Sequence, residues 1–354
     1  MTDKDPVRRR LCWRNGQAQR DRIPMTLPLV VTRIALTSRS RLPAQASFDV
    51  MGTVWQVSSN SEELLETIQE TFPLLSNMSA RADLSLFFQV NRQAQGSVTQ
   101  HRPHFRALDH LYYASFGPHD SMVIDQQHRR VVGQLSIELA RDKYFWKHTI
   151  LPVLVGIVSA SIGITPVHCA CVAKNDGTGL LLGGASGSGK STLAVTLAST
   201  GFNYLADDCT YLSRAGTEIC AWGLPIPAKL LPESVAYFPQ LRDATPRESL
   251  NGEIAFQVNP ADLFGSEPVL SCEPQWLIFI ERCAGTRPSF QTIGSQDAAN
   301  RLVQDLELLP ERIADQRGYQ LETIKQLVDR ECWVLRHGVS PQELAEVLAP
   351  FCGL

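Results

Sequence analysis

The sequence predicts an α/β fold in which a larger domain with a phosphate-binding loop follows a smaller α+β domain. Three observations support this prediction. The chain has 354 residues, more than a single compact core usually accommodates. Strand-like and helix-like segments alternate after residue 166, which is typical of layered α/β domains. A glycine-rich segment, Gly184 to Ser191, lies between an apolar run and a helical pattern.

The amino-terminal segment differs in charge from the rest of the chain. Residues 1–42 hold ten Lys and Arg residues against three Asp residues. The stretch from Trp13 to Arg22 is polar, so it lacks the apolar core of a secretory signal. We expect a poorly ordered basic extension over residues 1–42, and Met25 offers an alternative start of the same protein.

Residues 43–135 have the mixed pattern of a small α+β domain. Their role is not evident from any motif. We expect a helix over Ser61 to Thr71 with Ser59 or Asn60 as its cap. The expected strands are Phe48 to Val57, Leu84 to Val90, Ser121 to Ile124 and Arg130 to Val132.

Residues 136–354 are expected to form the second domain, opening with a long helix from Ser136 to about Ile162 that Pro152 interrupts. The apolar stretch from Ile150 to Thr165 has 16 residues, fewer than the roughly 20 that span a bilayer. We therefore expect a buried core helix and no membrane span.

The remaining elements follow from local signals. Asn175-Asp176-Gly177 predicts a tight turn between the strands Val167 to Ala173 and Gly179 to Leu182. Gly201 predicts the end of the helix that starts at Lys190, and Ser340 with Glu343 predicts a capping box. The other expected elements are the strands Tyr204 to Ala206 and Trp276 to Glu281 and the helices Asp297 to Leu309 and Leu321 to Val328.

The segment Gly184-Ala185-Ser186-Gly187-Ser188-Gly189-Lys190-Ser191, followed by Thr192, matches the phosphate-loop pattern without a mismatch. Glycines let successive backbone N–H groups turn toward phosphate oxygens, and the helix amino terminus adds partial positive charge. Lys190 is placed to reach the β- and γ-phosphates of ATP, and the Ser191 hydroxyl to bind Mg²⁺. The expected cofactors are therefore ATP and Mg²⁺.

Two adjacent carboxylates, Asp207 and Asp208, follow the next strand. They lie 17 and 18 residues after Lys190, at the carboxyl end of a strand, where open α/β sheets bind ligands. One carboxylate there is suited to orient the metal, and the other to accept the proton of an attacking hydroxyl. The alternative is a turn or helix-cap pair.

His168 precedes the loop, and a lone histidine in a strand is more often a core residue than a catalyst. However, His168, the loop and Ala206-Asp207-Asp208 occur in an order that resembles the catalytic domain of the HPr kinase/phosphorylase family. The resemblance covers Pro166 to Glu233. It implies an HPr kinase/PEP carboxykinase-like P-loop kinase fold, with Asp208 as base, Lys190 on phosphate and His168 in the catalytic group.

The resemblance is incomplete downstream. The family's E-I-R-G signature is replaced by Leu230-Leu231-Pro232-Glu233-Ser234. Glu233 stands at about the distance of the second metal ligand, beside Ser191 and Asp207. Lys229 is a candidate phosphate contact, and the family's later arginine has three candidates, Arg242, Arg247 and Arg282. The resemblance thus implies a divergent HPr-kinase-related serine kinase, without implying the phosphorylase reaction or the phosphocarrier substrate.

These patterns leave three hypotheses for the function. The first is a kinase acting on a serine of a protein or peptide, the second is a small-molecule kinase, and the third is a nucleotide-gated binding module without transfer activity. A net charge of −3 argues against a nucleic-acid partner. Nine scattered cysteines without a Cys-x-x-Cys pair indicate reduced thiols, hence a cytoplasmic protein. A homo-oligomer remains open.

Overall fold

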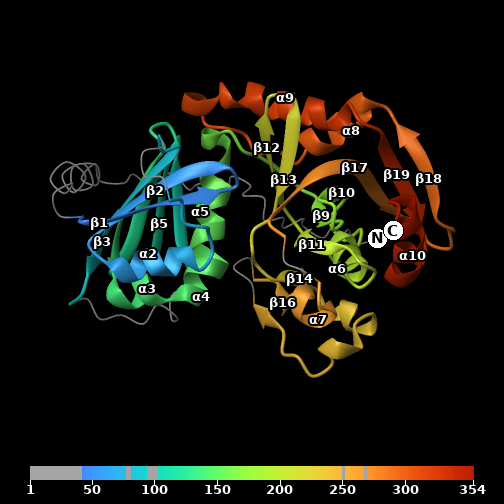
Figure 1. Cartoon of the computed structure of the whole chain (residues 1–354), viewed down its shortest axis with the longest axis horizontal. Coiled ribbons are helices and arrows are strands. Elements are labelled where there is room, and N and C mark those ends of the chain that lie inside the picture. The colour runs from blue at the N-terminus through green and yellow to red at the C-terminus, as the bar shows by residue number, and fades with distance from the viewer. Residues whose placement is uncertain (1–41, 77–80, 94–102, 249–251, 267–268) are drawn as a thin grey trace, which may run out of the picture.

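A computed structural model describes residues 42–76, 81–93, 103–248, 252–266 and 269–354. The predicted basic extension, apart from Leu42, lies outside the described residues. The described chain forms two lobes side by side (Figure 1). We call residues 42–164 the first lobe and residues 165–354 the second lobe.

The first lobe is built on a seven-stranded sheet of order β1-β2-β3-β7-β6-β5-β4. Its helix α2 (Glu62–Gln69) confirms the predicted helix, but the residue at its amino-terminal cap is Ser61 and not Ser59 or Asn60, and the Ser61 side chain makes no cap hydrogen bond. The strands are β1 (Ala44–Val50), β2 (Thr53–Ser59), β3 (Leu84–Asn91), β4 (His104–Leu108), β5 (Leu111–Gly117), β6 (Asp120–Asp125) and β7 (Arg130–Ser136).

The prediction of one strand over Phe48 to Val57 was wrong, because this segment contains a hairpin. Met51 and Gly52 form its turn with φ of 57° and 76°. Two positive φ values in a two-residue loop match the twist of an antiparallel pair. The Asp49 carboxylate accepts a hydrogen bond from Gly52 N at 2.9 Å and supports the turn.

A helical segment covers the sheet of the first lobe. It consists of α3 (Ile137–Arg141), α4 (Lys143–Phe145), the π-helix η3 (Trp146–Ile150), α5 (Leu151–Val158) and the 3-10 helix η4 (Ser159–Ile162). The predicted interruption at Pro152 was wrong: the helix breaks at Asp142, and it continues past Pro152, where the π-helix η3 changes to α5.

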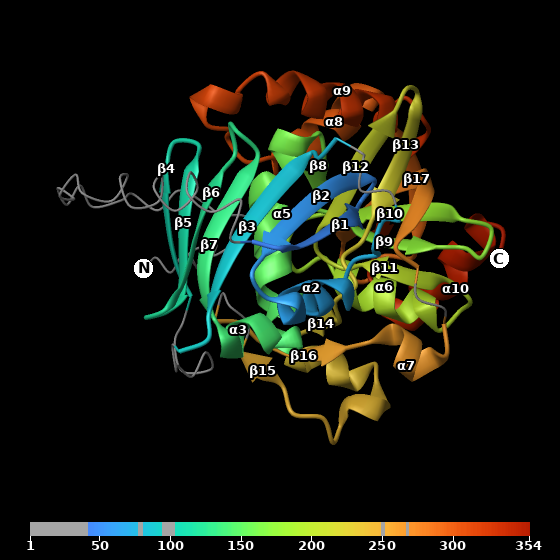
Figure 2. The ribbon, with the colours of Figure 1, turned by 60° about the vertical axis from the view of Figure 1, so that its left-hand side comes forward.

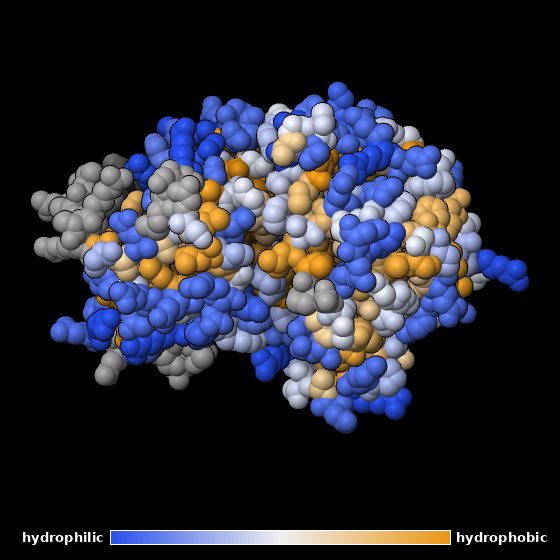
Figure 3. All heavy atoms as spheres, in the orientation of Figure 1, coloured by the Kyte–Doolittle hydropathy of each residue, from blue (hydrophilic) through white to orange (hydrophobic). Residues whose placement is uncertain are grey.

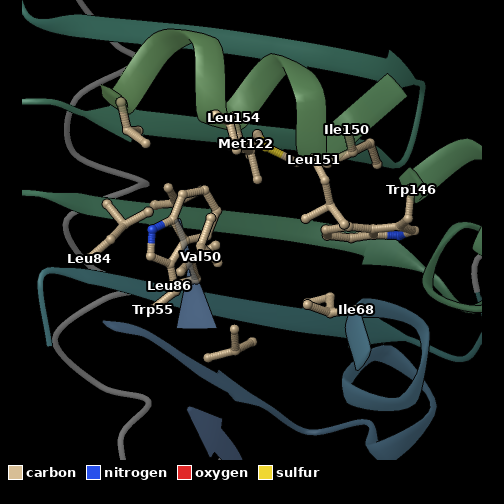
Figure 4. Close-up of a cluster of buried hydrophobic side chains, with 14 of the residues drawn as sticks. Val50, Trp55, Ile68, Leu84, Leu86, Met122, Trp146, Ile150, Leu151 and Leu154 are labelled. Atoms are coloured by element: carbon tan, nitrogen blue, oxygen red, sulfur yellow. The ribbon is translucent and has the colours of Figure 1, made fainter. Parts of the chain in front are cut away.

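The core of the first lobe fills the space between this segment and the sheet, with Trp146, Ile150, Leu151 and Leu154 facing Trp55 and its neighbours (Figure 4). The span Lys143–Ile162 is long and apolar enough to cross a membrane, but 67% of its apolar window is buried inside the protein. The helices that follow residue 135 therefore pack into the same core as the strands that precede it. The domain boundary that the sequence placed between residues 135 and 136 stays a prediction.

The second lobe contains a mixed sheet of order β11-β9-β10-β17-β13-β12-β8, with β19 and β18 beyond β17. Strands β10, β17 and β19 are parallel, and β9 is antiparallel to both β10 and β11. The carboxyl ends of β10, β11, β17 and β19 therefore lie at one edge. The strands are β8 (Thr165–Val167), β9 (Ala170–Ala173), β10 (Thr178–Gly183), β11 (Asn203–Ala206), β12 (Thr210–Ala215), β13 (Glu218–Trp222), β17 (Ser271–Arg282), β18 (Ser289–Ile293) and β19 (Cys332–His337).

Helices cover both faces of this sheet, which makes three layers. Helices α6 (Lys190–Ala198) and α10 (Pro341–Phe351) pack on one face. Helices α8 (Ser295–Val303) and α9 (Gln316–Val328) pack on the other (Figure 2). The predicted capping box at Ser340 and Glu343 is confirmed.

A smaller layer lies beside α6. It consists of β14 (Ala228–Leu230), β15 (Arg247–Glu248), β16 (Ile254–Val258), α7 (Pro260–Phe264) and the 3-10 helices η5 (Pro232–Ala236) and η6 (Pro239–Leu241). A further 3-10 helix, η7 (Glu311–Ile313), joins α8 to α9. Over much of one face, hydrophilic side chains surround smaller hydrophobic patches (Figure 3).

Candidate functional site

The glycine-rich loop leaves β10 and enters α6, so the predicted order of strand, loop and helix is confirmed. Gly184 has φ of +145°, and a side-chain carbon there would lie 2.8 Å from both Ile280 O and Ser188 Oγ. Only glycine fits this backbone without strain. Gly189, with φ of 96°, is the residue before α6. The loop is therefore tightly held at both ends.

Lys190 lies across the loop instead of extending into solvent. Its side chain is buried, with Nζ 2.8 Å from Gly184 O and 3.3 Å from Ala185 O. The two carbonyls compensate the burial of the ammonium group. Lys190 thus holds a positive charge against the start of the loop.

The first turn of α6 carries two hydroxyl groups that face other elements. Ser191 Oγ donates a hydrogen bond to Asp207 O at 3.3 Å, so the Ser191 hydroxyl lies next to the aspartate pair. Thr192 Oγ1 lies 3.2 Å from Ser234 Oγ, which fixes η5 against α6. Glu233, the predicted metal ligand, precedes Ser234 on η5 and is exposed.

Asp207 is buried behind the loop, at the end of β11. Its Oδ1 accepts a hydrogen bond from Tyr204 OH at 3.0 Å, and its Oδ2 accepts one from Lys229 N at 2.8 Å. Burial raises the pKa of Asp207 to about 6, although the hydrogen bond from Lys229 lowers it. Both oxygens thus serve protein contacts, and a metal would use their remaining lone pairs.

Asp208 faces the other way and meets His168, with Asp208 Oδ1 3.3 Å from His168 Nε2. The Asp208 side chain is 68% exposed, whereas the His168 side chain is 13% exposed. The hydrogen bond from His168 holds the pKa of Asp208 below its usual value, and the positive charge of Lys190 lowers it further. Asp208 is therefore an ionised, accessible carboxylate near the Lys190 ammonium.

His168 lies at a bend and not within a strand, which corrects the predicted strand from Val167 to Ala173. Strand β8 ends at Val167 and β9 starts at Ala170, with Cys169 N bonded to Val167 O at 2.8 Å. A hydrogen bond between residues i and i+2 marks a γ-turn, which bends the chain at His168. The two strands consequently pair with different neighbours, β12 and β10.

Asp305, the second partner of His168, was not predicted from the sequence. Asp305 Oδ2 lies 3.1 Å from His168 Nδ1, so a carboxylate contacts each ring nitrogen. The hydrogen bonds with Asp208 and then Asp305 raise the pKa of His168. The predicted helix Asp297 to Leu309 ends at Val303, which leaves Asp305 in the turn that follows. No local sequence signal marks a contact across 137 residues.

A cleft adjoins the loop on the side of α10. Gly189 lines it from the loop and Thr192 from α6, and Arg282 and His337 line it from the ends of β17 and β19. Arg282 is thus the arginine candidate that the fold brings to the loop. By contrast, Arg247 contacts the first lobe, where its Nη1 donates to Tyr144 OH at 2.9 Å. Arg242 is exposed after η6.

The residues at the carboxyl edge of the second-lobe sheet fit a nucleoside triphosphate with Mg²⁺. Among the described residues, nothing beyond the chain neighbours lies within 4 Å of where a side-chain carbon of Gly187 or Gly189 would stand, so the loop is open there, and Ser188 Oγ is buried without a hydrogen-bond partner. The metal candidates, Ser191, Asp207 and Glu233, offer only oxygen atoms, which Mg²⁺ prefers. Lys229 is exposed, and its charge lowers the pKa of both Asp207 and Asp208.

Comparisons with known proteins find similarity among solved structures only. No protein-family model matches the chain, and no curated protein matches its sequence. Among solved structures, the HPr(Ser) kinase/phosphatase of Coxiella burnetii is similar over 53% of this chain and 96% of its own, with 13% identity and a TM-score of 0.29. A TM-score this low carries no information about the site of this chain.

Proposed function

We propose that this protein is an ATP- and Mg²⁺-dependent kinase that transfers the γ-phosphoryl group to the hydroxyl of a serine in a protein or peptide. The observation that carries the proposal is the shared edge of the second lobe. The glycine-rich loop with Lys190 and the ionised carboxylate of Asp208 both lie there, after β10 and β11, the two strands that flank β9.

The proposed binding of ATP rests on the loop. Its backbone N–H groups, the amino terminus of α6 and Lys190 together supply positive potential to the phosphates. Ser191, with Asp207 and Glu233 nearby, would hold Mg²⁺, which neutralises charge that develops on the transferred group when it is bound. Arg282 would add a positive charge from the adjoining cleft.

The proposed handling of the acceptor rests on Asp208. An ionised carboxylate orients an incoming hydroxyl by accepting its hydrogen bond, and it takes the proton as the new O–P bond forms. His168, itself held by Asp305, fixes Asp208 Oδ1 and leaves the second carboxylate oxygen for the hydroxyl. The exposed side chain of Asp208 supports a large acceptor such as a peptide, because an enclosed pocket would exclude one.

The test is transfer from γ-labelled ATP to a lysate of the source organism, followed by mass spectrometry of the labelled species. Lys190→Ala should lose nucleotide binding together with transfer. Asp208→Asn should keep nucleotide binding and lose transfer, because it removes only the acceptor's base. Lys325→Ala and Asp329→Asn are matched controls, since both side chains are exposed on or after α9.

The same assay separates the alternatives. Consumption of ATP only with added sugars or nucleosides would identify a small-molecule kinase. Tight ATP binding without any labelled product would identify a nucleotide-gated binding module. Wild-type turnover by Asp208→Asn would remove Asp208 from the mechanism.

A further inference from the structure

Two histidines and an aspartate gather at one end of the first lobe, in turns that the proposed kinase site does not use. His110 precedes β5, Asp125 ends β6, and His128 lies in the turn between β6 and β7. One ligand atom from each lies within 4.8 Å of the other two. The pairing of Leu111 with Asp125 and of Asp125 with Arg130 fixes both turns side by side.

Of the two distances between ligand atoms in this cluster, one is longer and one is shorter than the separation of two atoms that bind the same metal ion. His110 Nε2 lies 3.8 Å from Asp125 Oδ1, too far for a hydrogen bond. His128 Nδ1 lies 2.8 Å from Asp125 Oδ2. Ligand atoms bound tetrahedrally to Zn²⁺ at 2.0–2.1 Å are about 3.3 Å apart, so small side-chain rotations bring all three atoms to a shared ion.

A second carboxylate orients the ring of His110. His110 Nδ1 lies 2.9 Å from Asp109 Oδ2, and His110 Nε2 lies on the side of Asp125, 3.8 Å from Asp125 Oδ1. A carboxylate accepts a hydrogen bond from a ring N–H, so Asp109 holds the ring with Nδ1 toward itself and Nε2 toward Asp125. A carboxylate behind a metal-binding histidine is the usual supporting contact of such sites.

The second lobe supports this carboxylate in turn. Arg312 Nε, in η7, lies 3.4 Å from Asp109 Oδ2, and Arg312 Nη1 lies 3.5 Å from Gln127 Oε1. The His110 and Asp125 side chains are 14% and 25% exposed, while that of His128 is 59% exposed. Two ligands are therefore partly buried at the junction of the lobes, and the third, His128, is exposed and contacts Asp125.

We propose that His110, Asp125 and His128 bind one Zn²⁺ ion at the junction of the two lobes, with Asp109 as the positioning residue behind His110. Two imidazoles and one carboxylate select Zn²⁺ and neighbouring transition metals over Mg²⁺. Binding of the ion displaces the proton that lies between His128 Nδ1 and Asp125 Oδ2. This proton moves to His128 Nε2 or to solvent. Water completes the coordination of the ion.

The experiment titrates the metal-free full-length protein with Zn²⁺ in excess Mg²⁺ by calorimetry, and with Co²⁺ by absorption spectroscopy. We expect one tight site that Mg²⁺ does not displace, and a Co²⁺ spectrum of a nitrogen and oxygen site without thiolate charge transfer. His110→Ala should abolish this site. Asp109→Asn should weaken it about 10- to 100-fold, because it removes the supporting carboxylate.

Controls separate this site from other metal-binding groups. His119→Ala removes an exposed histidine at the opposite end of the β5–β6 hairpin and should change nothing. His128→Gln alters an exposed turn residue, so its loss of binding cannot come from unfolding; circular dichroism of the metal-free variants checks this. Any of three results would overturn the proposal. The first is wild-type Zn²⁺ affinity in both His110→Ala and His128→Gln, and the second is only weak multi-site binding in the wild type. The third is a Co²⁺ spectrum with thiolate bands from the Cys171 and Cys272 pair.

Discussion

Replacing Asp207 with asparagine removes a buried ionisable group while keeping the size of the side chain. The asparagine oxygen can accept the hydrogen bond from Lys229 N, and its amide can donate to the oxygen of Tyr204 OH. The variant should therefore fold with the same local contacts. Any difference in pH dependence from the wild type then reports the ionisation of Asp207.

The magnitude follows from the pKa of Asp207, which burial raises from 3.8 to about 6. At about 1.4 kcal/mol per pKa unit, ionisation costs the folded state about 3 kcal/mol. Because the folded state keeps the proton to a higher pH than the unfolded state, stability from this group falls as the pH rises from about 4 and levels off above about 6. About half of the loss, roughly 1.5 kcal/mol, falls between pH 5 and pH 7.

The assay is urea unfolding at pH 5, 6, 7 and 8, followed by circular dichroism. Asp207→Asn should gain roughly 1.5 kcal/mol relative to the wild type between pH 5 and pH 7. Asp329→Asn, an exposed change in the same lobe, should follow the wild type. A difference between Asp207→Asn and the wild type that stays constant, or that shrinks as the pH rises, would refute the claim that a buried carboxyl group titrates in this range.

Three further changes test other parts of the structure. Asp305→Asn should lower the raised pKa of His168, which NMR titration of the ring would measure. Protonated His168 stabilises the fold, and this stabilisation is lost as the pH rises through the folded pKa of His168. In the variant, the loss of stability should therefore occur at lower pH than in the wild type. An unchanged pKa would exclude the contact. Gly184→Ala should cost about 1–3 kcal/mol in urea unfolding and weaken nucleotide binding, because of its φ of +145°, whereas Gly294→Ala, with φ of −67°, should not weaken that binding. Trp146→Ala should cost about 3–5 kcal/mol in the same assay, because Trp146 is fully buried in the core of the first lobe; a cost below 1 kcal/mol would contradict that packing.

Local sequence signals predicted the elements that short-range physics determines. The glycine pattern before Lys190 predicted a loop between a strand and a helix, because a tight curl of backbone N–H groups needs residues without side chains. The turn at Asn175-Asp176-Gly177 and the capping box at Ser340 were confirmed for the same reason. These features depend on neighbours within a few residues, so the chain alone specifies them.

The tertiary structure decided which distant groups meet. The hairpin at Met51 and Gly52 escaped prediction because Met is unusual at a positive φ. His168 changed from a strand residue to a bend residue because β8 and β9 pair with different strands. Asp305 contacts His168 from the turn after α8, because α8 ends at Val303. Sequence alone determined the glycine-rich loop between a strand and a helix and the adjacent aspartates after the next strand. Sheet pairing and helix packing, which act between distant segments, decided which carboxylates contact His168 and which aspartate is buried.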